Sequence, residues 1–253
     1  MRLLEVKGLS KRFRGVAALS KVSLEIDEGE LVGLIGPNGS GKTTLFDCVT
    51  GFIVPDEGRV YLNGEDITNQ RPDSIALKGV VRTFQSARLF LKLTVLDNMI
   101  LAIQQHWKKG YLAGISNPSV IRALEYQARE KALNLLHLVD LETRVNDQAR
   151  SLSYGQRKLL TVAMALMPNP KVVLLDEPTA AVNPVLIEKM KAAIRALNEQ
   201  GQTFLIIEHK VDFLADLCDK VMVLDHGEKI AEGTPEDILR NSRVIEAYFG
   251  GRR

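Results

Sequence analysis

The hydrophobic and polar positions change their period along the chain, and each period predicts a type of element. Apolar and polar residues alternate at Leu4–Leu9 and Val22–Ile26, as they do in half-buried antiparallel strands. Leu31–Ile35 is instead continuously apolar, which is typical of a strand covered on both faces. A glycine-rich turn and a helix from about Lys42 to Thr50 follow it. This succession predicts an α/β fold that begins with an antiparallel part.

The middle of the chain has a helical period. From about Thr94 to Val139 the apolar residues recur every three or four positions, which gives one apolar helix face. A polar stretch from His106 to Pro118 contains Lys-Lys-Gly and Ser-Asn-Pro, which indicates a surface loop. We expect one domain over residues 1–253, with a mostly helical subdomain at about 87–153 inserted into a core of about 1–86 and 154–253.

After this insertion the alternation of strands and helices resumes. The predicted elements are a helix at Gln156–Met167, strands at Val172–Leu175 and Thr203–Ile207, helices from Pro184 and at Val211–Leu217, a hairpin across Asp225–Glu228 and two short terminal helices. Two further short strands, Arg59–Leu62 and Val80–Phe84, are predicted before the insertion. The sequence contains no internal repeat, low-complexity tract or flexible linker. The organisation therefore predicts an interrupted α/β core.

A phosphate-binding loop is the first motif that carries chemistry. The turn after the buried strand reads Gly36, Pro37, Asn38, Gly39, Ser40, Gly41, Lys42, Thr43 and Thr44. This fits GxxxxGK[ST] between a strand and a helix, where glycines let backbone N–H groups surround the phosphates and the helix N-terminus adds its positive end. Lys42 would bind the same phosphate oxygens, and the Thr43 hydroxyl would ligate Mg²⁺. ATP and Mg²⁺ are the expected cofactors.

Two acidic residues end a second buried strand. Val172–Leu175 is apolar throughout and is followed by Asp176 and Glu177. A parallel strand delivers such carboxylates at its carboxyl end, where ligands of open α/β sheets bind. Asp176 would hold Mg²⁺, and Glu177 would act as general base on the attacking water. An apolar run ending in two acids is common by itself, and the upstream phosphate loop is what makes it informative.

A third segment narrows the class of nucleotidase. Leu152–Gln156 reads LSYGQ and resembles the LSGGQ signature of the ABC ATPase family, with Tyr154 in place of the first glycine. The resemblance implies that Ser153, Gly155 and Gln156 contact the γ-phosphate of ATP bound to an opposite subunit. Tyr154 leaves this intact if its side chain points outward, because the backbone amide remains. Ser153 also suits an ordinary helix N-cap, which is compatible with that role.

The resemblance to ABC ATPases extends over nearly the whole chain and assigns four further positions. It implies that Phe13 stacks on adenine, that Gln85 contacts Mg²⁺ and couples to a transmembrane partner, and that His209 bridges Glu177 and the γ-phosphate. Asn183 matches the D-loop, where many relatives carry Asp, but it also suits a helix N-cap before a first-turn proline. The fold expected is therefore α/β, a P-loop NTPase (RecA-like) core with an antiparallel β subdomain and an inserted helical subdomain.

Two stretches are similar to a narrower group, the ATPase subunits of branched-chain amino acid importers. They are Ala87–Phe90 with Leu93–Asn98, and the terminal Gly233–Gly250. Kinship would imply a second ATP-binding subunit, identical or paralogous, two transmembrane permeases, and indirectly an extracytoplasmic solute-binding protein. The cargo would be branched-chain amino acids or another small carboxylate. Glu208–Val211 departs from the acidic residue expected after the switch histidine, which weakens the assignment of cargo.

Composition limits the remaining alternatives. The 253 residues carry a net charge of +2, which argues against a strong nucleic-acid field, and no apolar run approaches the ~20 residues of a membrane span. Two distant cysteines indicate free thiols in a reducing compartment. We expect a cytosolic chain, peripheral at the cytoplasmic face of the inner membrane, with no nucleic-acid partner.

A soluble ABC ATPase of DNA repair or translation is the alternative function, although such proteins usually add coiled coils, zinc-binding cysteines or a second cassette. A small-molecule P-loop kinase is disfavoured by the signature.

Overall fold

The computed structural model describes residues 1–84, 89–103 and 118–249. These divide into two compact units. The first comprises Met1–Arg82, Lys171–Pro178 and Leu197–Arg253, and the second comprises Thr83–Pro170 and Thr179–Ala196. The boundaries of the helical subdomain expected from the sequence, at about residues 87–153, stay a prediction.

The first unit begins with a four-stranded antiparallel sheet. Its strands are β1 (Arg2–Phe13), β2 (Val16–Asp27), β4 (Glu57–Leu62) and β5 (Glu65–Asp66), in the order β2-β1-β4-β5. The two alternating segments of the sequence are confirmed as strands, but each is part of a 12-residue strand. The register between β1 and β2 shifts at several points, one of them between Val6 and Leu9, so simple alternation of apolar and polar residues extends over only part of each strand.

A six-stranded sheet forms the centre of the first unit. Its strands are β3 (Leu31–Ile35), β6 (Val80–Arg82), β7 (Val172–Asp176), β8 (Thr203–Ile207), β9 (Lys220–Asp225) and β10 (Glu228–Gly233), in the order β10-β9-β3-β8-β7-β6. All neighbours are parallel except β9 and β10. Every residue of β3, β7 and β8 is buried, as their continuous apolar sequences predicted. The segments that follow these three strands therefore start at one edge of the sheet.

The helices of the first unit are short. They are α1 (Lys42–Val49), α2 (Pro72–Lys78), α8 (Val211–Ala215), α9 (Pro235–Arg240) and α10 (Ser242–Phe249). The sequence reading missed α2, although Pro72 occupies its first turn and Gly79 ends it in the left-handed conformation. Both are recognised helix boundaries. Strand β6 is also shorter than expected and ends at Arg82, not at Phe84.

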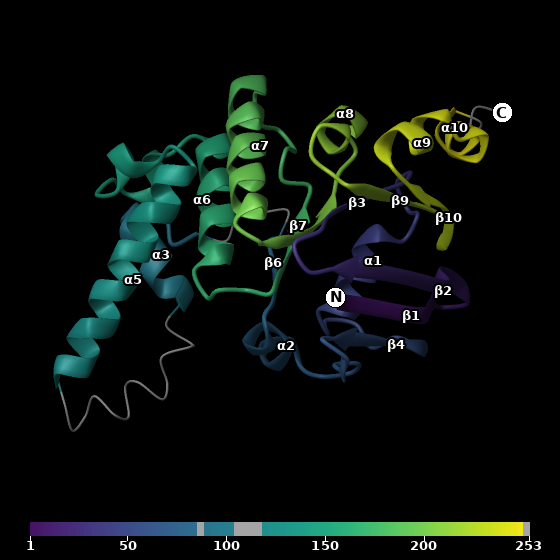
Figure 1. The fold of residues 1–253 in the computed structure, drawn as a ribbon, viewed down its shortest axis with the longest axis horizontal. Helices are drawn as coiled ribbons and strands as arrows, with labels where there is room; N and C mark the ends of the chain where they lie inside the picture. Colours follow the sequence, from purple (N-terminus) through teal and green to yellow (C-terminus); the bar gives the residue numbers. More distant parts are fainter. Residues whose placement is uncertain (85–88, 104–117, 250–253) are drawn as a thin grey trace. The chain divides into compact units, whose positions relative to one another are not determined.

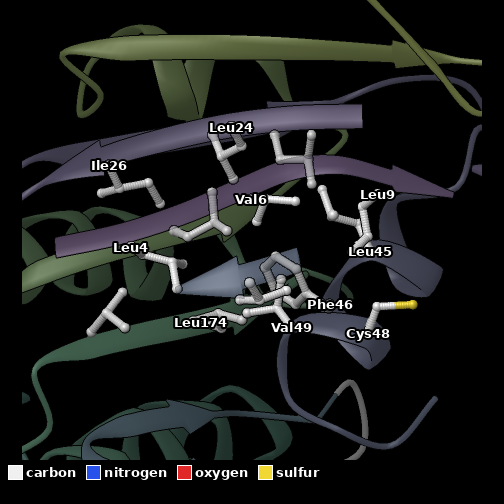
Figure 2. Close-up of a cluster of buried hydrophobic side chains, with 14 of the residues drawn as sticks. Leu4, Val6, Leu9, Leu24, Ile26, Leu45, Phe46, Cys48, Val49 and Leu174 are labelled. Atoms are coloured by element: carbon white, nitrogen blue, oxygen red, sulfur yellow. The ribbon is translucent and has the colours of Figure 1, made fainter. Parts of the chain in front are cut away.

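The main hydrophobic core of the first unit lies between the antiparallel sheet and α1. Figure 2 shows Leu4, Val6 and Leu9 of β1, with Leu24 and Ile26 of β2, facing the side chains of α1. The residues of α1 that meet them are Leu45, Phe46, Cys48 and Val49. This packing holds the helix that follows the phosphate loop in a fixed position, because close-packed interiors resist displacement.

The second unit is mostly helical (Figure 1). It contains α3 (Val95–Ile103), α5 (Pro118–Leu138), α6 (Tyr154–Leu166), most of α7 (Pro184–Glu199), and 3₁₀ turns at Glu142–Arg144 and Ala149–Ser151. Helices α3, α5 and α6 contact one another pairwise. The loop predicted at His106–Pro118 lies almost wholly outside the described residues. Of the helices in the described ranges, none has both the length and the apolar character that crossing a membrane requires.

Candidate active site

The phosphate loop connects β3 to α1 and encloses its own lysine. Ser40 and Lys42 are buried, and the Lys42 ammonium donates to the carbonyl oxygens of Gly36 at 2.8 Å and Pro37 at 3.0 Å. Burial lowers the pKa of Lys42, while the nearby carboxylates of Glu177 and Asp176 act to raise it. The loop therefore presents a cation that is only partly stabilised by its protein surroundings, which suits an anionic ligand.

Gly36 shows why this loop requires glycine at its entrance. Its φ is +154°, and a Cβ atom built there would lie 2.1 Å from the carbonyl oxygen of Leu224 and 2.6 Å from Ser40 Oγ. The first of these neighbours is backbone of β9 and cannot rotate away. Glycine thus lets the loop turn tightly against the sheet.

The start of α1 has backbone donors available for phosphate. Its N-cap residue, Gly41, provides no side-chain hydrogen bond to the first turn. The first N–H groups of a helix have no intrahelical partner, so an uncapped start is a natural anion site. The adjacent Thr43 side chain is exposed and Thr44 is half-buried. Pro37 is half-buried, and Asn38 and Gly39 are exposed at the turn of the loop.

The carboxyl end of β7 places two acidic side chains next to β8. Asp176 is buried, and Glu177 adopts a positive φ of 46°, which is uncommon for a non-glycine residue. The Glu177 N–H donates to the Ile207 carbonyl at 3.0 Å, so the strand pairing continues through this strained position. The Glu177 side chain lies 3.0 Å from Nε2 of His209, which follows β8. The backbone thus aims Glu177 at the histidine.

The donors present suit Mg²⁺. Thr43 offers an exposed hydroxyl and Asp176 a carboxylate, and both are the hard oxygen ligands that this ion prefers. Gln85, the third expected ligand, lies outside the described residues.

Arg82 is a neighbour of this site that the sequence reading did not identify. It ends β6, beside β7, and its guanidinium donates to Asp176 Oδ2 at 2.8 Å and to Asp47 Oδ1. Its Cζ lies 5.4 Å from the ring centre of Phe46. A charged residue within the predicted strand Val80–Phe84 was the available signal, but the sequence alone did not identify its partners.

Phe13, the expected adenine-stacking residue, is the last residue of β1. Its side chain is 44% exposed, so the ring is not part of the core. Lys11 Nζ lies 5.7 Å from the ring centre and also pairs with Asp56 at 2.8 Å. An exposed ring at a strand end is free to stack on a planar ligand.

The signature segment belongs to the second unit, at the start of α6. The Ser153 hydroxyl accepts from the Gln156 N–H at 3.3 Å, and the Gln156 side chain accepts from the Ser153 N–H at 2.9 Å. This capping box confirms that Ser153 is an N-cap. Tyr154 is 47% exposed and so points outward, as the sequence interpretation required. Gly155 is buried, and a Cβ there would lie 2.5 Å from Leu186 Cδ1.

Asn183 has the capping role expected for it. Its side-chain oxygen accepts from the Leu186 N–H at 3.0 Å, directly before α7 begins at Pro184. Ala181, two residues earlier, has a positive φ of 56°. This loop of the second unit is therefore shaped by its own backbone and cap.

The expected site residues fall into two groups. The first unit brings together the phosphate loop, Asp176, Glu177 and His209, because β3, β7 and β8 end at one edge of one sheet. Ser153, Gly155 and Gln156 belong to the second unit. Their roles toward ATP stay predictions.

A cavity of about 540 Å³ lies against the outer side of the phosphate loop. Its lining comes from Pro37, Asn38, Gly39 and Ser40, from Asp225, His226 and Ile230 of the β9–β10 hairpin, and from Arg243, Glu246 and Ala247 of α10. Lys42 and Thr43 do not line it. The cavity therefore faces the turn of the loop and not the start of α1, where the backbone N–H groups that could bind phosphate lie.

Comparison with known sequences assigns the family. The sequence model described as ABC transporter matches residues 19–180. The chain belongs to the ABC transporter family. A second model, described as branched-chain amino acid ATP-binding cassette transporter, matches residues 228–253 of this ABC cassette.

Full-length relatives of this ABC cassette include two named transport proteins. It is 41% identical to the high-affinity branched-chain amino acid transport ATP-binding protein BraF of Pseudomonas aeruginosa, over 98% of each chain. It is also 41% identical to the probable branched-chain amino acid transport ATP-binding protein LivG of Archaeoglobus fulgidus, over 100% of this chain and 97% of that one.

Solved structures agree with the observed fold. A nucleotide-free ATP-binding cassette from an ABC transporter matches with a TM-score of 0.85 and 35% identity, covering 99% of this chain and 100% of that one. The ADP conformation of another such cassette matches with a TM-score of 0.84 and 36% identity over 99% of each chain. The predicted P-loop NTPase fold and ATPase class are thus confirmed, and the chain is a nucleotide-binding cassette.

Proposed function

We propose that this chain is the ATPase subunit of an importer for branched-chain amino acids or related small carboxylates. The observation that carries the proposal is the 41% identity to BraF over 98% of both chains. The match of residues 228–253 to the branched-chain transporter model supports it independently, because that segment lies outside the general cassette match. The subunit would act peripherally at the cytoplasmic face of the membrane, bound to two transmembrane permeases that receive cargo from an extracytoplasmic binding protein.

ATP would bind through its phosphates to the Lys42 loop and the start of α1, with adenine stacked on Phe13. Thr43, Asp176 and Gln85 would hold Mg²⁺, which neutralises charge on the phosphate oxygens when bound. Burial of Lys42 favours this arrangement, because a desolvated ammonium gains more from an anionic ligand than a solvated one.

Glu177 would then accept a proton from water as the water oxygen attacks the γ-phosphorus. The bond from the γ-phosphorus to its bridging oxygen breaks, which releases ADP and inorganic phosphate. His209, at 3.0 Å from the Glu177 carboxylate, would hold that carboxylate in line and bridge it to the γ-phosphate.

Each ATP would be enclosed by two subunits. Ser153, Gly155 and Gln156 of a second copy, or of a paralogous subunit, would contact the γ-phosphate at the start of α6. A related cassette, 28% identical over 92% of this chain with a TM-score of 0.77, is described as a dimeric structure bound to ADP and phosphate. This relative supports dimerisation of the cassette. Hydrolysis would then release the charge-assisted contacts to the γ-phosphate.

The test is purification of the tagged full chain from membranes, followed by reconstitution of what copurifies. Mass spectrometry should find hydrophobic permeases, and proteoliposomes containing the complex and its binding protein should accumulate labelled leucine only with ATP. A complex carrying Glu177→Gln is the matched control and should not accumulate it. Copurification with ribosomes or DNA would overturn the proposal in favour of a soluble ABC ATPase. Uptake of an unrelated solute instead of leucine would overturn the cargo.

A further inference from the structure

Arg82 joins three elements that converge on the predicted metal site. It ends β6, and its two terminal nitrogens contact Asp176 at the end of β7 and Asp47 on α1. The Arg82 and Asp176 side chains are only 5% and 8% exposed. Asp47 is 25% exposed, and the Phe46 ring covers the guanidinium. The three charged groups therefore form one largely desolvated cluster.

The cluster combines one positive charge with two negative charges. Arginine stays protonated in proteins, so one guanidinium faces two carboxylates in a planar, two-pronged arrangement. Asp176 Oδ2 is engaged at 2.8 Å by a cation that belongs to the protein. A divalent cation that approaches Asp176 thus meets a carboxylate whose charge is already partly offset.

We propose that Arg82 is a positioning residue that makes divalent-cation binding at Asp176 depend on bound nucleotide. The inference rests on the proposed function, because it takes Asp176 as a ligand of Mg²⁺. Arg82 holds the carboxylate in place but weakens its attraction for a free cation. The phosphates of ATP supply further negative charge and oxygen ligands, which compensate for the weakened attraction of Asp176 for the cation. The cation then binds with ATP and not before it.

A purely structural ion pair that ties β6, β7 and α1 together predicts something different. Its loss would reduce stability and activity without creating any new affinity for a cation. The discriminating quantity is therefore cation binding to the nucleotide-free protein, which measures no catalysis.

The experiment titrates Mn²⁺ as a spectroscopic substitute for Mg²⁺ into the full chain, with free ion followed by electron paramagnetic resonance. Without nucleotide, wild type should bind weakly, and Arg82→Met should bind roughly 10- to 100-fold more tightly because a nearby cation is gone. Arg82→Lys keeps the charge but not the two-pronged contact, and it should bind Mn²⁺ more weakly than Arg82→Met does. A folded Arg82→Met protein with unchanged affinity would overturn the inference.

A second variant covers the case in which Arg82→Met fails to fold. Asp47→Asn keeps the contact between Arg82 and Asp176 but removes one negative charge from the cluster. With a non-hydrolysable ATP analogue present, this variant should bind Mn²⁺ roughly 10-fold more weakly than wild type. Equal affinity in Asp47→Asn and wild type would contradict the electrostatic role of the cluster.

One further measurement separates this inference from the proposed function. Binding of a fluorescent ATP analogue in the presence of EDTA reports nucleotide affinity without a cation. A wild-type chain that binds no nucleotide would refute the proposed function and the inference with it. A wild-type chain that binds nucleotide, with Arg82 and Asp47 variants that leave Mn²⁺ affinity unchanged, would refute the inference alone.

Discussion

His209 Nε2 lies 3.0 Å from Glu177 Oε1, although the two residues are 32 positions apart in the chain. The distance follows from the sheet, because β7 and β8 are parallel neighbours with Asp176 opposite Ile207. Glu177 and His209 are the first and second residues beyond that pair. The positive φ of Glu177 then turns its side chain out of the strand alternation. Local strain of this kind is concentrated at functional sites.

The pairing predicts how two substitutions combine. Glu177→Gln should slow ATP hydrolysis by about 10²- to 10⁴-fold, the usual contribution of a general base, because the amide cannot accept the proton. His209→Ala should also slow it, since it removes the imidazole that lies 3.0 Å from the Glu177 carboxylate. The double variant should be no slower than Glu177→Gln, because the two residues act as a unit.

Steady-state phosphate release at saturating ATP measures this set of variants. Glu177→Gln should still bind ATP analogues as wild type does, which controls for damage to the nucleotide site. Multiplicative losses in the double variant would show that His209 acts independently of Glu177.

A second prediction concerns the entrance of the phosphate loop. Gly36→Ala should destabilise the protein by roughly 2–3 kcal/mol more than Gly201→Ala, because its Cβ would overlap the Leu224 carbonyl. Gly201 is the matched control, since it also has a positive φ, +92°, but has no heavy atom within 4 Å of the added Cβ. Urea denaturation followed by circular dichroism gives the difference. Gly36→Ala should also lose nucleotide binding, whereas Gly201→Ala should keep it. Equal stability of the two variants would contradict the overlap.

Much of the first unit was predictable because its local signals agree with its fold. The buried strands β3, β7 and β8 are apolar apart from Asp176 and Thr203, and the motif residues lie at or just beyond their carboxyl ends. Once three parallel strands are recognised, their carboxyl ends meet at one edge without further information. This is why the phosphate loop and Glu177 could be placed together from sequence, whereas the resemblance to ABC ATPases supplied the place of His209.

The features that were missed depend on neighbours distant in sequence. Arg82 pairs with residues 35 and 94 positions away, and no periodicity encodes such contacts. Helix α2 was missed because its seven residues are too few to show a clear period, although Pro72 and Gly79 mark its ends. The division into two units cuts through α7, and a helix pattern carries no sign of such a boundary. Sequence thus predicts strand ends better than it predicts tertiary pairs.

A third prediction concerns the two thiols, which are free and buried as the sequence indicated. Burial raises the pKa of the Cys48 thiol to about 12, and it raises the pKa of the Cys218 thiol as well. Since the thiolate is the reactive form, native protein at pH 8 should react with almost no Ellman's reagent, and two thiols should react in urea. A fast thiol in the native wild type that is absent from Cys48→Ser would contradict this.

The last prediction concerns a half-buried lysine in the second unit. Lys131 of α5 donates to the Met167 carbonyl at 2.9 Å and to the Asn169 side chain, where the chain leaves α6. Burial lowers the pKa of Lys131 from 10.5 to about 8. Below pH 8 the folded and unfolded chains both carry the proton, so the full penalty of burying the charge is present.

Between pH 8 and 10.5 the folded chain loses this proton first, so the unfolded chain binds more protons and the free energy of unfolding rises with pH. Solvent screening at this half-buried position limits the gain to about 1 kcal/mol. The measurement is the urea midpoint from pH 7.5 to 10.5 for wild type and Lys131→Met, because their difference removes the other titrating groups. The difference should move in favour of wild type across that window. A difference that stays constant would mean that Lys131 keeps its ordinary pKa in the folded chain.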